Sequence, residues 1–136
     1  MRSQKLTLPK TVTRKWHQID ASIAPIGRVA SLIANILRGK HKRNFTSHMD
    51  IGDFVVAVNT GKLKFTGRKL EQKKYFRHSG YLGGIKSETL KAVIQKDPGE
   101  ALKRAVFSMI DDVKFRKKII SRLKLVKGFE HNYKID

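Results

Sequence analysis

The 136-residue sequence contains no cysteine, which excludes disulfide bonds, thiolate metal ligands and a thiol nucleophile. No window approaches the roughly 18 consecutive apolar residues that a membrane-spanning helix needs. Acids are scarce, with 11 Asp and Glu against 30 Lys and Arg, and they are too scattered to indicate a catalytic carboxylate pair. No Ser-His-acid order stands out either, so the chain is not expected to be an enzyme.

The charge that is present is strongly positive, with a formal net charge of +19. Self-repulsion of this size destabilises a compact monomer unless a polyanion or counterions neutralise it. Nucleic acid is the expected polyanion, and a membrane surface is the lesser alternative. Because 40% of the residues are hydrophobic, a chain of this length can bury a core as one domain. The expected location is the cytoplasm.

Apolar periodicity and turn signals predict a single α/β domain at 15–136, preceded by a basic N-terminal arm at 1–14. A transit peptide would have a similar composition, but an arm that is ordered or lies on RNA is the favoured interpretation of residues 1–14. Alternating strands and helices imply crossover connections and a mainly parallel sheet between helical layers. The expected caps are Ser87, Asp97 and Gly39. Strands are expected at 15–21, 54–59, 73–80 and 123–128, and helices at 25–40, 87–97, 97–110 and 114–124.

The stretch "RHSGYLGGIK" at 77–86 combines three glycines with basic and aromatic residues, a composition that often holds phosphate. The dinucleotide fingerprint is absent, because it requires a preceding buried strand, a following helix and a ribose-binding acid. The P-loop is absent too, because Lys86 follows Ile rather than Gly. The simpler interpretation is a tight turn in which Gly80, Gly83 and Gly84 adopt positive φ. No nucleotide, other cofactor or small-molecule substrate is expected.

The segment "HMDIGD" places His48, Asp50 and Asp53 close together, as in an oxygen-rich metal site. No helical His pair or His-x-His spacing accompanies it, and the surrounding cations would repel a metal ion. The two acids are instead expected to pair with nearby Arg and Lys, or to shape the turn before the buried strand. No metal site is predicted.

Basic residues recur in clusters at turns and loop edges, with aromatic residues between them. Lys, Arg and backbone N–H groups bind phosphates, while rings and guanidinium planes stack on splayed bases. No helix-turn-helix, zinc finger or RNP motif is present, so groove reading of DNA is not indicated. The pattern favours a binder that follows the shape of folded RNA, although a solvated basic face would carry the same charge. The clusters are Arg38, Lys40, Lys42 and Arg43; Lys62, Lys64, Arg68 and Lys69; Lys73, Lys74 and Arg77; and Arg116, Lys117, Lys118, Arg122 and Lys124.

Several segments occur in the order and at the spacing of a known family: "RKWHQIDA", "IGRVASLIANILRGKHK", "DIGDFVVAVNTGKLKFTGRK", "KKYFRHSGYLGGIK" and "LKLVKGFEHNY". From about Val12 to Tyr133 the chain resembles the large-subunit ribosomal protein 13 family in its bacterial form. The resemblance implies a three-layer α/β/α sandwich around a small, mainly parallel sheet, without catalytic activity. It also implies direct binding to large-subunit (23S) rRNA early in subunit assembly, beside neighbouring large-subunit proteins and away from membranes.

The resemblance also implies RNA contact at particular residues of two matched segments, the basic loop at 38–42 and the glycine-containing segment at 75–86. Positive charge alone makes members of the other basic clusters further expected RNA contacts. Tyr81 is included because its ring could stack on a base or form a hydrogen bond. The full set of expected RNA-binding residues is Arg38, Lys40, His41, Lys42, Arg43, Arg68, Lys69, Lys73, Lys74, Tyr75, Arg77, His78, Tyr81, Gly83, Gly84, Lys86, Arg116, Lys117 and Lys118.

One region departs from the family pattern. After Met109 the family usually has a loop containing Pro and Gly, whereas this chain has "IDDVKFRKKIIS". Asp112 is therefore expected to cap a helix that begins near Val113.

Two functional alternatives also remain at this point: a regulatory protein that binds an mRNA element through the same surface, and a nucleotide-dependent enzyme with Mg²⁺–nucleotide near Lys86.

Overall fold

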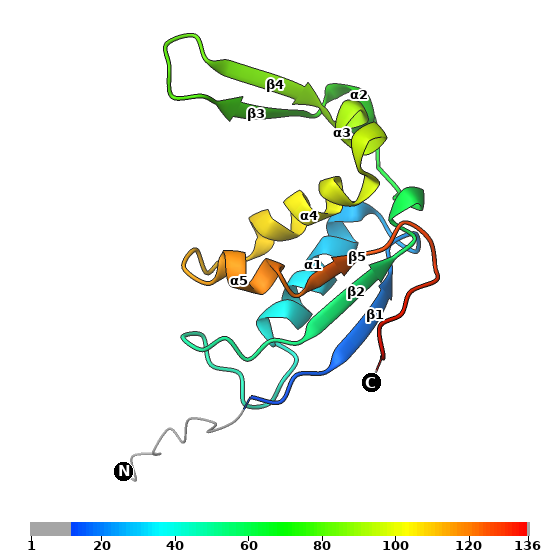
Figure 1. Ribbon diagram of the computed structural model, residues 1–136, viewed down its shortest axis with the longest axis vertical. Coiled ribbons are helices and arrows are strands. Elements are labelled where there is room, and N and C mark those ends of the chain that lie inside the picture. Colours follow the sequence, from blue (N-terminus) through cyan, green and yellow to red (C-terminus); the bar gives the residue numbers. More distant parts are fainter. Residues whose placement is uncertain (1–11, 136) are drawn as a thin grey trace.

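The computed structural model describes residues 12–135 of the chain. Figure 1 shows an elongated molecule, in which a small sheet and its helices form a body and a two-stranded ribbon projects from one end. Most of the predicted N-terminal arm, 1–14, lies outside the described residues.

The body is built on a three-stranded sheet of order β1–β2–β5, in which both pairings are parallel. The strands are β1 (Trp16–Asp20), β2 (Phe54–Val58) and β5 (Leu123–Leu125). The continuous apolar run of β2 places it at the centre, where a strand is covered on both faces. Residues 55–58 are accordingly all buried. The prediction of an α/β fold with a small parallel sheet is confirmed.

Three helices pack on one face of this sheet: α1 (Ile26–Arg38), α4 (Pro98–Met109) and α5 (Arg116–Ile120). The apolar stripe of α1 and the α4 side chains Leu102 and Val106 form a single core with Val55 of β2. Helix α1 ends at Gly39, whose φ of 79° lies in the left-handed region that glycine adopts without strain. The predicted caps of α1 and α4 are confirmed, since the Asp97 carboxylate accepts from the Gly99 N–H at 3.0 Å.

The opposite face of the sheet is covered differently. There the Trp16 ring stacks on Phe54 at a centroid distance of 4.4 Å and on Tyr133 of the C-terminal segment at 5.3 Å. Within residues 12–135 the helices that enter the core lie on one face only. The predicted second helical layer, and with it the three-layer sandwich, is therefore not confirmed.

The projecting ribbon is an antiparallel hairpin of β3 (Lys74–His78) and β4 (Ile85–Thr89). The strand expected at 73–80 thus exists but does not join the parallel sheet. Short helices α2 (Lys69–Gln72) and α3 (Leu90–Lys96) lie at its base, and the 3₁₀ turn η1 (Thr60–Lys62) follows β2. The expectation that Ser87 caps a helix is wrong, because Ser87 lies in β4 and Thr89 caps α3.

The basic helix expected at 114–124 is shorter than predicted. Helix α5 spans only Arg116–Ile120, and its N-cap residue is Phe115 rather than Asp112. The expectation that Asp112 caps a helix beginning near Val113 is therefore wrong. The side chain of Asp112 is instead near a guanidinium group of α1, at 3.7 Å from Arg38 Nη2.

The close approach of α1 to the segment before β2 requires glycine at position 52. A Cβ atom on Gly52 would lie 1.6 Å from the Leu37 carbonyl oxygen, which belongs to the backbone and cannot rotate away. We expect Gly52→Ala to lower the free energy of unfolding by about 3 kcal/mol or more, as measured by urea denaturation.

The matched control is Gly27→Ala in α1, where an added Cβ would meet no atom within 4 Å. This change should leave stability unaltered or raise it by about 0.5–1 kcal/mol, because alanine favours helix. Equal effects of the two substitutions would contradict the packing of α1 against 50–53.

Candidate nucleic-acid interface

Two carboxylates in the turn before β2 organise the basic end of α1. The first, Asp50, receives both guanidinium nitrogens of Arg122, Nη1 to Oδ2 and Nη2 to Oδ1, each at 2.6 Å. Arg122 Nη2 also donates to the Leu37 carbonyl at 3.0 Å. Arg122 is buried, so its assignment to a surface cluster of cations is wrong. A buried Arg requires such a bidentate partner to offset its lost hydration.

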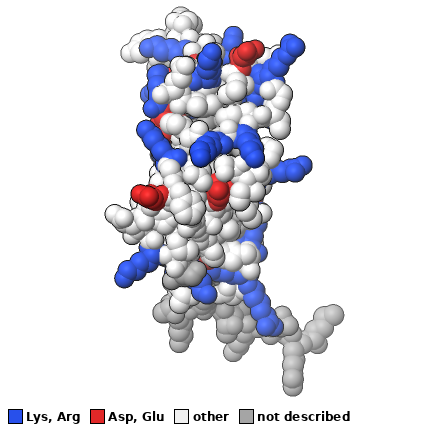
Figure 2. Space-filling view, turned by 90° about the vertical axis from the view of Figure 1, so that its right-hand side faces the viewer, with Lys and Arg blue, Asp and Glu red and all other residues white. Residues whose placement is uncertain are grey.

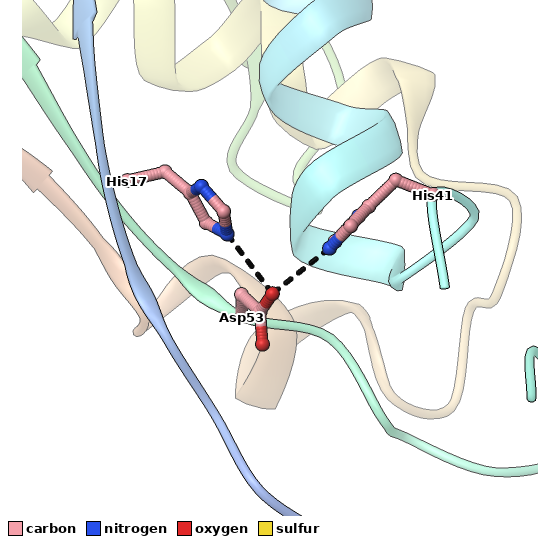
Figure 3. Close-up of side chains that lie close together, drawn as sticks. All are labelled: His17, His41 and Asp53. Atoms are coloured by element: carbon pink, nitrogen blue, oxygen red, sulfur yellow. Dashed lines mark hydrogen bonds and ion pairs between the residues drawn. The ribbon is translucent and has the colours of Figure 1, made fainter. Parts of the chain in front are cut away.

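The second carboxylate, Asp53, is fully buried and accepts from several donors (Figure 3). Its Oδ2 lies 3.0 Å from His17 Nε2 and 2.9 Å from His41 Nε2. Its Oδ1 accepts from the Lys15 N–H at 3.1 Å and lies 2.5 Å from Lys42 Nζ. Asp53 therefore ties the loop that follows α1 to β1 and β2.

This arrangement points the Lys42 side chain inward. Its ammonium group also donates to the carbonyls of Thr13 at 2.9 Å and Ile51 at 2.8 Å. Only 17% of the Lys42 side chain is exposed, whereas the neighbouring Lys40 and Arg43 are exposed. Lys42 thus holds the loop in place, and its outer neighbours present charge to solvent.

Among residues 12–135, His17, His41 and Asp53 form a group that could ligate a metal ion, since their ligand atoms lie within 4.8 Å of one another. An ion there would sit beside the Lys42 ammonium and displace hydrogen bonds that already satisfy both carboxylate oxygens. The geometry therefore favours a positioning role for the cluster. The set considered from sequence, with His48 and Asp50, does not form, because Asp50 pairs with Arg122.

Burial of the Asp53 carboxyl, the largest single influence, acts to raise its pKa. Hydrogen bonds from Lys42, His17 and the Lys15 N–H together outweigh burial and lower the pKa to about 2. The ionised form is therefore stabilised in the folded chain, by about 2 kcal/mol relative to an ordinary Asp.

The hairpin presents a second group of predicted residues. Tyr75, Arg77 and Lys86 line one groove of about 560 Å³. Glu88 and Arg104, which were not among the predicted residues, also line it, and the Arg104 guanidinium lies 4.8 Å from the centre of the Tyr75 ring. Arg77 and Lys86 are directly cross-strand partners, so two like charges share one side of the ribbon. Cross-strand like charges destabilise a hairpin unless an anion lies between them.

The turn between β3 and β4 combines two positive-φ glycines with one steric requirement. Gly80 and Gly83 have φ of 89° and 69°, as predicted. Gly84 does not have positive φ; it is favoured because a Cβ would lie 2.9 Å from the Tyr81 carbonyl oxygen, a backbone atom, and 2.1 Å from Ser79 Oγ. At the tip the Tyr81 side chain is exposed, and the His78 Nδ1 accepts from the Gly80 N–H at 2.9 Å.

The remaining predicted residues fall into exposed and anchored groups. Arg116 is anchored, because its Nε donates to the Ile110 carbonyl at 2.9 Å and its guanidinium lies over Phe107. Arg38 is anchored by ion pairs with Asp111 and Asp112. The exposed cations are Arg68, Lys69, Lys73, Lys74, Lys117 and Lys118.

The predicted residues do not form one compact patch. Figure 1 places the β3–β4 turn and the loop after α1 toward opposite ends of the long axis, with α5 between them. Figure 2, which views the right-hand side of Figure 1, shows Lys and Arg distributed along the height of the molecule and few acids. Within residues 12–135 no helix is both long enough and apolar enough to cross a membrane.

Residues 14–132 match the family model described as Ribosomal protein L13. The chain belongs to this family. It is 46% identical over 123 residues to the large ribosomal subunit protein uL13 of Chlorobium phaeobacteroides, covering 90% of this chain and 82% of the relative. The protein of the same name from Natranaerobius thermophilus is 44% identical over 131 residues, covering 96% and 92%. A third, from Nitratiruptor sp., is also 44% identical, covering 96% and 94%.

Membership confirms the resemblance found in the motifs. Ribosomal protein L13 is a family of structural ribosomal proteins rather than of enzymes, which confirms the expectation that this chain is not an enzyme. The prediction that Asp50 and Asp53 pair with Arg and Lys is confirmed, but the parts of His17 and His41 in the Asp53 network were missed. A signal was present, because Asp50 and Asp53 are the only acids between Asp20 and Glu71.

The Asp53 network predicts a specific loss of stability in acid. Since the folded-state pKa of Asp53 lies below the unfolded value, its contribution is fully present above about pH 4 and is lost as the pH falls through about 2. We expect the free energy of unfolding of the unaltered chain to fall between pH 4 and 2 by about 2 kcal/mol more than that of Asp53→Asn. Denaturant titrations at each pH measure both.

The control is Glu130→Gln, which removes an exposed acid and should preserve the acid profile of the unaltered chain. If Asp53→Asn also retained that profile, Asp53 would not be the group whose protonation weakens the fold.

Proposed function

We propose that this chain is a structural constituent of the large ribosomal subunit that binds large-subunit rRNA directly and joins early in assembly. The observation that carries the proposal is the exposed cross-strand pair Arg77 and Lys86 on the projecting hairpin. Family membership supports it independently, because the relatives bear the name large ribosomal subunit protein.

The charge pair has a direct physical consequence. A two-stranded ribbon is marginally stable alone, and facing like charges weaken it further. A phosphate group between Arg77 and Lys86 would convert this repulsion into two charge-assisted hydrogen bonds. The hairpin is thus suited to the closely spaced phosphates of folded RNA.

The turn of the hairpin adds contacts of a different kind. The exposed ring of Tyr81 can stack on an unpaired base, which is how proteins bind single-stranded RNA segments. Gly83 lies at the surface, and without a side chain its backbone can approach a phosphate closely. Gly84 shapes the turn, and His78 both caps it and remains exposed for RNA contact.

The loop after α1 and helix α5 extend the proposed interface along the molecule. Lys40 and Arg43 face solvent, while His41 and Lys42 fix the loop through Asp53. Phosphate contacts at separated points would hold several RNA helices in a fixed relation, which is the expected contribution to assembly. The other proposed contacts are Arg38, Arg68, Lys69, Lys73, Lys74, Tyr75, Arg116, Lys117 and Lys118.

The proposed partners are large-subunit rRNA and adjoining large-subunit proteins, without membrane or small-molecule substrate. The proposed location is the cytoplasmic ribosome. Residues 15–136 would act as a single RNA-binding domain and 1–14 as a basic arm.

The hairpin pair can be tested by its effect on salt dependence. We expect Arg77→Gln with Lys86→Gln to weaken binding to large-subunit rRNA and to reduce the magnitude of the slope of log K against log salt by about 1.5, because two phosphate contacts are lost. Filter binding from 50 to 200 mM salt measures this slope.

The matched control is Lys91→Gln with Lys103→Gln, which removes the same charge from exposed helical positions outside the proposed interface. It should change the slope much less. Identical slopes for the two double variants would remove the hairpin from the interface and leave only a diffuse effect of net charge.

A further inference from the structure

The segment between α4 and α5 bears two acids that pair with the basic end of α1. Asp111 Oδ2 lies 3.0 Å from Arg38 Nη1 and 3.6 Å from Lys40 Nζ. Asp112 Oδ2 lies 3.7 Å from Arg38 Nη2. Two cations expected to contact RNA are therefore already paired within the chain.

These ion pairs differ from those of the other acids near this loop. The side chains of Asp50 and Asp53 are 7% and 1% exposed, and the cations closest to them, Arg122 and Lys42, are 6% and 17% exposed. Asp111 is 71% exposed and Lys40 is 45% exposed, whereas the Arg38 side chain is 11% exposed. The carboxylate of Asp111 is thus largely in water, where an ion pair contributes little to stability, so a phosphate that approaches from solvent can replace Asp111 at small cost.

We propose that Asp111 and Asp112 form an acidic clasp, which occupies the cation positions of Arg38 and Lys40 until RNA phosphates displace it. The inference rests on the proposed rRNA binding. The clasp weakens binding to RNA that cannot offer a phosphate at this place, and so increases the preference for the cognate folded RNA.

The reason is the competition between two anions for the same donors. Non-specific RNA binding is dominated by the number of phosphates that cations neutralise. A carboxylate on Arg38 lowers that number for any RNA. Folded RNA can present a phosphate to the guanidinium in a fixed bidentate geometry, and such a phosphate replaces the carboxylate efficiently. A flexible strand loses conformational entropy when it adopts that geometry, so it replaces the carboxylate less efficiently.

The test compares Asp111→Asn with Asp112→Asn against a control of equal charge. The control is Glu71→Gln with Glu130→Gln, both exposed and without an ion pair within residues 12–135. Both double variants raise the net charge by two. The probes are a single-stranded polyuridine oligonucleotide and a large-subunit rRNA transcript, titrated at 50–200 mM salt.

We expect the Asn variant to bind polyuridine about three- to tenfold more tightly than the control at the lowest salt, with a salt slope steeper by about one phosphate contact. Its affinity for the rRNA transcript should rise less, so the ratio of rRNA to polyuridine affinity should fall. Asp111→Glu with Asp112→Glu keeps the charge and should restore the ratio of the unaltered chain.

Three outcomes would overturn the clasp. These are equal polyuridine affinity of the Asn and Gln variants, weaker binding by the Asn variant, and an unchanged affinity ratio. Weaker binding would mean that the acids support the loop rather than compete with RNA. A separate failure concerns the proposed function: if the unaltered chain bound the rRNA transcript no better than polyuridine, direct rRNA recognition would be wrong before the clasp is considered.

Discussion

The carboxylate of Asp53 is the contact on which the basic end of the molecule depends. It is buried where α1, β1 and β2 converge and joins His17 and His41 (Figure 3). It also pairs with Lys42. In a chain of net charge +19, a loop rich in cations would otherwise move away from its neighbours. The buried anion counters this repulsion locally, so that adjacent cations can be held in a defined place and still face solvent.

Two kinds of cation therefore coexist in this protein. Arg122 and Lys42 use their charge inside the molecule, each paired with a buried carboxylate. Among residues 12–135, Arg77 and Lys86 have no such partner, and they share one side of an exposed ribbon. The first kind fixes the shape of the surface, and the second supplies binding energy when phosphate arrives. The division explains how so basic a chain folds while keeping charge available for RNA.

Local sequence signals predicted β1, β2, β3 and β5, helix α1 and the Asp97 cap, because apolar periodicity and capping depend on nearby residues, but they missed β4. They did not predict that β3 pairs only with β4, since a strand pattern does not specify its partner. The burial of Arg122 could not be predicted from local sequence either, because it depends on Asp50, 72 residues away in the chain. Of the candidate site, the tight turn with positive φ at Gly80 and Gly83 could be predicted from the sequence. The inward direction of Lys42 could not, because it follows from the tertiary position of Asp53.

The most direct test of the account is a residue-level map of protein–RNA crosslinks in isolated large ribosomal subunits that contain this chain. We expect crosslinks to large-subunit rRNA within 77–86 and at Lys117 or Lys118, and none at the buried Arg122. Absence of the chain from large subunits, or crosslinks confined to parts of the chain outside the hairpin, the loop after α1 and α5, would contradict it.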